Sequence, residues 1–174
     1  YLWVGDKIVE WDKDSHEIVW EWSVFDHYNM NDYDIYGDTW WLGFNDGYYD
    51  WTHVNAIAYS EAENAIYISC RHLSRITKID YTTGEIIWNM GLEMPSGDVN
   101  CGQDLGFSFQ HGLQKLESGN IITFDNGNLS QHFLNTEVPT SRALEISILN
   151  DQASIVWEHP LPENLFGFAS GNAQ

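Results

Sequence analysis

The 174-residue sequence has few basic residues and no long apolar run. Seven lysines and arginines stand against 26 aspartates and glutamates, which gives a formal net charge of −19. A charge of this size repels phosphate backbones and anionic lipid surfaces, so we expect no nucleic-acid partner and no membrane partner. No segment approaches the roughly 18 consecutive apolar residues of a spanning helix. The first residues carry neither the basic region nor the cleavage site of a signal peptide.

Cysteine is also scarce. Cys70 and Cys101 could form one disulfide bridge or none, and their spacing matches no zinc-binding pattern. The compartment therefore cannot be read from them. We expect neither a metal site nor a cofactor.

Apolar and aromatic residues are plentiful, at 43% and 15% of the chain, which is enough for a core. They occur in short β-branched and aromatic runs separated by Gly, Asn, Asp and Ser, a pattern typical of strands. Helix is expected only within residues 26–50 or 162–166. The predicted strands are Lys7–Trp11, Glu17–Trp22, His53–Tyr59, Ala65–Cys70, Arg75–Tyr81, Glu85–Met90, Asn120–Phe124, Ala143–Leu149 and Ser154–Glu158.

These strands repeat. The segment Ile79–Trp88 is a strand, a turn with Gly84 and a second strand that ends on tryptophan. Trp11–Trp20 repeats it with His16 in the glycine position, and Ile148–Trp157 repeats it more loosely. A second repeat places His53 and His111 at equivalent positions, and the end of the chain resembles the start of a third copy. Each period supplies about four short strands, the content of one β-propeller blade.

The predicted fold class is therefore all-β, a fragment of a β-propeller. A sandwich or an up-and-down barrel does not require tryptophans at a fixed long interval. A closed propeller needs more blades than this chain holds, so we expect it to be part of a longer protein. Two acidic or irregular stretches interrupt the blades and are candidate binding loops. The expected order is the outer strands of one blade (1–25), an acidic aromatic loop (26–52), a blade (53–91), a loop (92–109), a blade (110–162) and the start of another (163–174).

Two histidines hold equivalent positions in successive blades, and an arginine lies near them. The first strand of a blade lines the central channel, so the repeat predicts that His53 and His111 point into one funnel. Asn55 shares the strand face of His53 by alternation, and Arg71 ends the next strand near the same mouth. Together they suit an oxyanion with several oxygens. The alternative is that each histidine is a structural hydrogen-bonding group and the arginine an ion-pair partner.

Several short motifs resemble those of a known family. Asp50-Trp-Thr-His-Val-Asn55, Ser69-Cys-Arg71, Gln110-His111, Phe124-Asp-Asn-Gly127 and Ser141-Arg142 occur in the order found in the bacterial aryl-sulfate sulfotransferases, six-bladed propellers of the periplasm. The resemblance covers nearly the whole chain.

The resemblance implies transfer of a sulfuryl group from an aryl sulfate to a phenol without a nucleotide donor. His111 matches the nucleophile that becomes sulfated, while His53, Asn55 and Arg71 match residues that hold and polarise the group. We assign His53, Arg71 and His111 as catalytic, and Asn55 and Trp51 as substrate-binding. A neutral imidazole is a competent nucleophile, and a protonated His53 can give its proton to the departing phenolate. The resemblance also implies a periplasmic or extracellular location; the other expected partners are the remaining blades or a homo-oligomer.

Several features depart from that pattern or leave alternatives open. The family's further channel histidine would lie before Tyr1, and its short-range disulfide ahead of the nucleophile has no counterpart, because Cys101 has no second cysteine beside it. One alternative is a noncatalytic propeller scaffold or extracellular binding component; another is a quinone-dependent dehydrogenase. The aspartates from Asp32 to Asp50 lack the spacing of a calcium loop, so we expect a solvated acidic loop there. Trp40 and Trp41 could wall an aromatic pocket.

Overall fold

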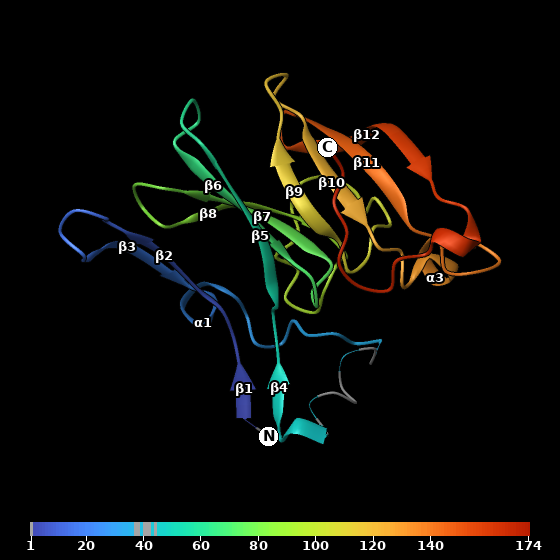
Figure 1. The fold of residues 1–174 in the computed structure, drawn as a ribbon, viewed down its shortest axis with the longest axis horizontal. Helices are drawn as coiled ribbons and strands as arrows, with labels where there is room; N and C mark the ends of the chain where they lie inside the picture. The colour runs from blue at the N-terminus through green and yellow to red at the C-terminus, as the bar shows by residue number, and fades with distance from the viewer. Residues whose placement is uncertain (1, 37–38, 40–42, 44) are drawn as a thin grey trace.

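The computed structural model describes residues 2–36, 39, 43 and 45–174. The fold is all-β with few helical residues, as predicted, and its several sheets remain open. Two sheets have four strands each and two have two (Figure 1). Among the described residues, no helix is long and apolar enough to cross a membrane. Asp38, Trp40 and Trp41 lie outside the described residues.

The central sheet is an antiparallel meander with the order β5-β6-β7-β8. The second sheet is a meander of the same kind with the order β9-β10-β11-β12. The first strands of the two sheets, β5 and β9, contact each other. The strands are β5 (Val54–Ser60), β6 (Ala65–Cys70), β7 (Arg75–Asp80), β8 (Ile86–Gly91), β9 (His111–Lys115), β10 (Ile121–Asp125), β11 (Arg142–Leu149) and β12 (Gln152–Pro160).

Near the N-terminus, β2 (Lys7–Trp11) and β3 (Ile18–Ser23) form a two-stranded hairpin. All nine predicted strands are confirmed, with ends shifted by a few residues. The sequence did not predict the short parallel pair β1 (Leu2–Val4) and β4 (Tyr48–Asp50). Nor did it predict α3 (Ser130–Phe133), whereas α1 and a 3₁₀ turn lie close to where helix was expected, at Val24–His27 and Glu163–Leu165.

The repeated turns are made by different residues. Gly84 has a φ of 74°, which is the left-handed conformation that favours glycine. His16 takes the same region, at 61°, and its ring stacks on Trp11. In the third copy the turn is made instead by Asn150 and Asp151, both at positive φ, the requirement of a two-residue hairpin turn. The three copies therefore share a pair of strands but differ in the residues of the turn between them.

The core consists of two clusters on the two sides of the central sheet. One packs β2, β3 and α1 against residues such as Trp51, Ile68 and Leu73. The other lies between the central and second sheets and includes Tyr67, Trp88 and Phe107. Cys70 and Cys101 are buried in different clusters, and both are free thiols. Burial raises the pKa of Cys70 to about 12 and that of Cys101 to about 11.

The acidic loop is not a solvated run of charges, which corrects that expectation. Asp32 and Asp34 are buried. Asp32 forms an ion pair with the buried Arg75, with Oδ2 2.8 Å from Nη2, and accepts hydrogen bonds from the backbone and hydroxyl of Ser96. Asp34 accepts hydrogen bonds from the backbone of Tyr36 and from Thr39. Asp32 therefore joins both long loops to the central sheet.

Candidate active site

His53 lies in a short linker between β4 and β5. Its φ of 49° places it in the left-handed region, and β5 begins only at Val54. Asp6 holds this linker, because its carboxylate accepts hydrogen bonds from the hydroxyl of Thr52 and the backbone of Val54. The imidazole is 45% exposed, and its Nδ1 lies 2.5 Å from Oδ2 of Asp50. His53 therefore forms a carboxylate–imidazole pair that opens to solvent.

Asp50 is the acid of this pair. Partial burial would raise its pKa, but the hydrogen bond from His53 and the charges of His72, His53 and Arg71 outweigh burial and lower it. The carboxylate is consequently ionised at neutral pH and can stabilise a positive charge on His53.

His72 is a member of this site that the sequence analysis missed. It directly follows Arg71 at the end of β6 and belongs to none of the sequence motifs. Its ring stacks on His53 at a centroid distance of 4.6 Å, and its Nδ1 donates to the backbone oxygen of Asp50 at 2.6 Å. Burial lowers the pKa of His72 to about 4, and the charges of His53 and Arg71 act in the same direction. His72 is therefore a neutral ring that stacks on His53.

Arg71 lies where the sequence placed it, at the end of β6. The backbone N–H groups of Arg71 and His72 bond to the carbonyls of His53 and Thr52, which fixes this strand end beside the histidine linker. The guanidinium lies over the Phe109 ring, 4.7 Å from its centroid, and Nη2 contacts the carbonyl of Phe168 at 3.4 Å. Residue Arg71 is only 7% exposed, so most of its side chain is packed against its neighbours.

His111 is the first residue of β9. Its Nδ1 lies 2.7 Å from Oδ1 of Asn126 and 3.1 Å from the carbonyl of Phe109, and its Nε2 faces the backbone N–H of Ser170 at 3.4 Å. Burial lowers its pKa; the hydrogen bond with Asn126 opposes this, while the charges of Arg71 and His53 lower it further. Burial therefore favours the neutral imidazole, and its Nε2 accepts a hydrogen bond from the backbone N–H of Ser170.

The structure brings His53, Arg71 and His111 together. Asn55 bonds the Gln110 carbonyl and Arg71 lies over Phe109, so the segments that carry the two histidines and the arginine lie side by side. The charges of both His53 and Arg71 act on the His111 ring, so the three groups share one electrostatic environment. The site thus combines an imidazole with a lowered pKa, a guanidinium and a second imidazole paired with a carboxylate.

Asn55 and Trp51 have other contacts. Asn55 does not share a strand face with His53 as predicted, because His53 lies outside the strand and the register shifts between Val54 and Ala56. Its Nδ2 donates to the Gln110 carbonyl at 2.7 Å and so joins β5 to the segment before His111. Trp51 has no exposed surface, and its Nε1 donates to the Asp32 carbonyl. The structure therefore corrects the assignment of Trp51: it packs the core and has no surface to offer a substrate.

One set of side chains in the described part of the chain has the composition of a metal-binding group. Ligand atoms of Asp50, His53 and His72 lie within 4.8 Å of one another. Two imidazoles and a carboxylate are ligands suited to zinc. In this structure they bond with each other, and the positive charge of Arg71 lies beside them. These contacts favour hydrogen bonding as their role.

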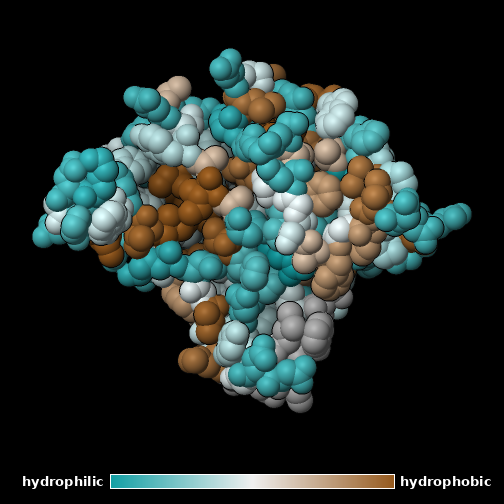
Figure 2. Space-filling view, viewed as in Figure 1, coloured by the Kyte–Doolittle hydropathy of each residue, from teal (hydrophilic) through white to brown (hydrophobic). Residues whose placement is uncertain are grey.

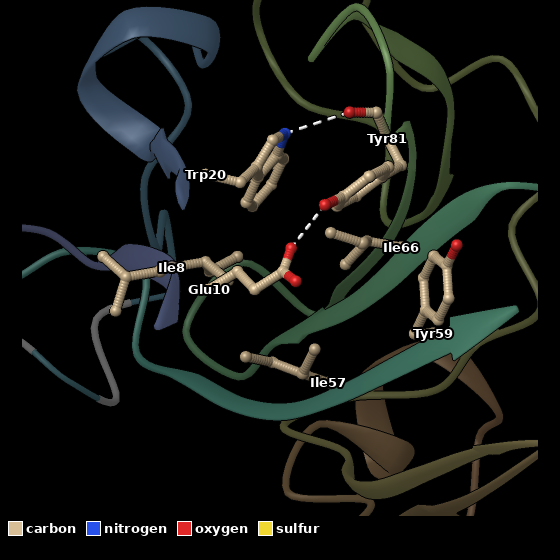
Figure 3. A pocket seen from close by; sticks show the side chains of 8 residues that line it. Ile8, Glu10, Trp20, Ile57, Tyr59, Ile66 and Tyr81 are labelled. Carbon is tan, nitrogen blue, oxygen red and sulfur yellow. Dashed lines mark hydrogen bonds between the residues drawn. The ribbon is translucent and has the colours of Figure 1, made fainter. Parts of the chain in front are cut away.

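A separate apolar groove of about 360 Å³ lies between the β2–β3 hairpin and the central sheet (Figure 3). Brown surface gathers along it in Figure 2. The Tyr81 hydroxyl donates to Glu10 and the Trp20 indole donates to the Tyr81 carbonyl at its rim. Its described lining residues are Ile8, Val9, Glu10, Trp20, Ile57, Tyr59, Ile66 and Tyr81, so it is distinct from the histidine site.

Comparison with known proteins decides the family. The family model for arylsulfotransferase (ASST) matches residues 2–163, which is most of the chain. The chain belongs to the arylsulfotransferase family. The match includes His53, Arg71 and His111 and confirms the resemblance read from the sequence motifs. No curated protein matches the chain. Membership of the arylsulfotransferase family supports a sulfotransferase activity in general terms.

Proposed function

We propose that this arylsulfotransferase-family protein transfers a sulfuryl group from an aryl sulfate to a phenol through a sulfated His111. The observation that carries the proposal is the joint placement of the Nε2 face of His111, the Arg71 guanidinium and the Asp50–His53 pair at the meeting of β5 and β9. The roles of the three groups follow from their chemistry.

In the first half-reaction, the lone pair on Nε2 of His111 forms a bond to sulfur. The bond between sulfur and the phenolic oxygen breaks, and its electron pair leaves with the oxygen. Protonated His53 supplies the proton that this oxygen takes, and Asp50 stabilises the charged form of His53 before transfer. The second half-reaction is the reverse with another phenol, whose proton returns to His53 while the electron pair of the nitrogen–sulfur bond returns to Nε2.

Arg71 provides charge where the sulfuryl oxygens would lie. A guanidinium can bond two oxygens at once, and a loose transition state for group transfer depends chiefly on positioning and charge. The cation–π contact with Phe109 restricts where the guanidinium can point. In a chain of net charge −19, this positive charge is the group most suited to attract an anionic donor.

The test is a single-turnover reaction with a chromogenic aryl sulfate and no acceptor. We expect release of one phenol per active chain and a His111 peptide heavier by one sulfuryl group in mass spectrometry. His111→Gln should remove both signals, while His159→Gln, on the outer strand β12, should retain them. Normal turnover by His111→Gln would overturn the proposal.

We also propose that the two meanders and the β2–β3 hairpin are units of a propeller. Supporting this are the identical strand order in the two four-stranded sheets and the contact between their first strands. The hairpin has half as many strands as its neighbours, and the apolar groove of Figure 3 lies beside it. Two further strands on the free edge of β2 would complete that unit and cover the groove. A crystal structure of the longest natural form of the protein would test this arrangement.

A further inference from the structure

Asn126 is buried completely and follows β10 directly. Its side chain makes three hydrogen bonds within 2.8 Å. The Nδ2 group lies 2.6 Å from the carbonyl of Gly167 and 2.8 Å from that of Ser170, and Oδ1 lies 2.7 Å from Nδ1 of His111. Its backbone carbonyl accepts a fourth bond, from the Ser141 hydroxyl. The residue is therefore held on several sides.

These contacts determine which way the amide points. Carbonyl oxygens only accept hydrogen bonds, so the two carbonyls must face the NH₂ group of Asn126. The amide oxygen then faces His111, and it too can only accept. The Phe109 carbonyl, 3.1 Å from the same ring nitrogen, is a second acceptor. The proton of the neutral His111 ring must therefore be on Nδ1, which leaves the lone pair on Nε2.

We propose that Asn126 is a positioning residue that fixes His111 in the Nδ1–H tautomer, so that Nε2 is the nucleophilic atom. The inference rests on the proposed function in that His111 is taken as the nucleophile. When Nε2 forms its bond to sulfur, Nδ1 keeps its proton and the ring becomes positively charged. The oxygens of Asn126 and Phe109 then accept a hydrogen bond from a charged donor, which is stronger than one from a neutral donor.

The choice of asparagine over aspartate follows from the same geometry. A carboxylate in this place could not donate to the carbonyls of Gly167 and Ser170. It would also stabilise the protonated form of the imidazole and so remove the Nε2 lone pair from a larger fraction of molecules at a given pH. An amide accepts from Nδ1 without adding charge to the site.

Asn128 offers a matched control. Its Nδ2 donates to the Phe168 carbonyl at 3.1 Å, so it anchors the same C-terminal segment as Asn126. None of its described contacts reaches His111. A variant of Asn128 thus loosens the segment without removing an acceptor from Nδ1.

The experiment uses 15N-histidine-labelled protein, with His111→Gln to identify the His111 resonances. Long-range proton–nitrogen spectra report which ring nitrogen carries the proton. We expect Nδ1–H for the wild type, for Asn126→Asp and for Asn128→Ala, and a mixture of tautomers for Asn126→Ala. The Asp and Ala variants lose the same two donor bonds, so a tautomer difference between them reports the acceptor at Nδ1, with its charge, and not the loss of the donors.

The kinetic counterpart is sulfuryl transfer by the same variants. Asn126→Ala should lower kcat by about 10²-fold with KM nearly unchanged, since the Phe109 carbonyl remains and Asn126 does not face the substrate. Asn128→Ala should stay within about twofold of wild type. In Asn126→Asp the acid limb of the kcat/KM profile should move to higher pH, because the carboxylate stabilises the protonated His111 ring. The charges of Arg71 and His53, which also act on His111, are unchanged in this variant.

A wild-type His111 with its proton on Nε2, or an Asn126→Ala variant with the wild-type tautomer, would overturn the inference. An equal tautomer change in Asn128→Ala would overturn it as well. Absence of transfer by the wild-type protein would instead refute the proposed function, and the spectra would still decide the role of Asn126.

Discussion

The Asp50 carboxylate lies 2.5 Å from Nδ1 of His53, three residues further along the chain, and its own backbone carbonyl accepts a hydrogen bond from Nδ1 of His72. One residue therefore orients two stacked imidazoles. Both rings have Nδ1 facing an acceptor, so both present Nε2 away from Asp50. For His53 this is the nitrogen that the proposed mechanism uses to exchange a proton with the phenolic oxygen.

Asp50→Asn should lower kcat for aryl sulfates with basic leaving groups by roughly 10²-fold, because the charged form of His53 loses its carboxylate partner. Nitrophenyl sulfate should be affected less, since its leaving group needs less help from an acid. The measurement is the dependence of kcat on leaving-group basicity, which should become steeper in the variant. Asp46→Asn, at an exposed acid of the same loop, is the control; an unchanged slope in Asp50→Asn would contradict the role of the pair.

Arg71→Lys should lower kcat/KM for the donor by about 10²-fold, because an ammonium cannot bond two sulfuryl oxygens in the fork geometry of a guanidinium. Inorganic sulfate should inhibit the wild type competitively and the variant far more weakly. Lys13→Ala, which removes an exposed positive charge, separates this effect from a change in net charge. Equal inhibition of Arg71→Lys and wild type would show that the anion binds elsewhere.

The pH profile of kcat/KM should keep its acid limb below the ordinary histidine pKa of about 6.5. His111 must be neutral to attack, and burial together with the charges of Arg71 and His53 lowers its pKa. The rate should therefore rise with pH through this lowered value. In Arg71→Gln, which has lost one of those charges, the limb should move to higher pH, and a limb that stays in place would indicate that Arg71 does not act on His111.

Glu63 should contribute to stability in a defined pH range. It bonds Lys78 at 3.0 Å and Lys115 at 3.1 Å, and so joins the central sheet to β9. Burial alone would raise its pKa, but its hydrogen bonds with Tyr67, Lys78 and Lys115 lower it to about 2 from 4.5. Because the folded-state pKa is lowered, the stabilisation is fully present above about pH 4.5 and is lost as the pH falls toward about 2.

Glu63→Gln should accordingly reduce the free energy of unfolding by about 1 kcal/mol at pH 7, given the partial exposure of the group. The difference from wild type should shrink between pH 4.5 and pH 2 in chemical denaturation. Glu21→Gln removes one side of the exposed pair with Lys7 and should change stability by less than about 0.5 kcal/mol. A pH-independent difference for Glu63→Gln would mean that packing, and not charge, explains the effect.

The strands and the contact between the first strands of the two sheets could be predicted because both depend on local pattern. Alternating apolar residues and turn residues locate strands, and equivalent places in a repeat become neighbours when the sheets contact each other. His72 and Asn126 could not be found in this way. Their roles depend on hydrogen bonds to carbonyls of Asp50, Gly167 and Ser170, which no spacing of residue types encodes.

The same reasoning explains the two errors that concern the acidic loop. Trp51 belongs to the motif that contains His53, so its position in sequence suggested a place at the substrate; in the structure the tryptophan faces inward and His53 outward. Asp32 sits in a run of acids, which is usually solvated. Its burial depends on Arg75, a residue far along the chain whose guanidinium has no exposure of its own.

Asp32→Asn tests whether this buried pair holds the two long loops. Oδ2 of Asp32 bonds the guanidinium of Arg75 at 2.8 Å and accepts from the Ser96 hydroxyl, and Nε and Nη1 of Arg75 have no hydrogen-bond partner within the described residues. Removing the carboxylate charge would leave the arginine buried without compensation, which costs about 3–5 kcal/mol. Thermal and denaturant unfolding should both shift, and protease cleavage should increase in residues 26–36 and 92–109 together.

Glu93→Gln changes an exposed acid of the second loop and should leave the melting temperature unchanged. If Asp32→Asn unfolds like wild type, or if only one loop becomes sensitive to protease, the pair does not join the loops to the central sheet.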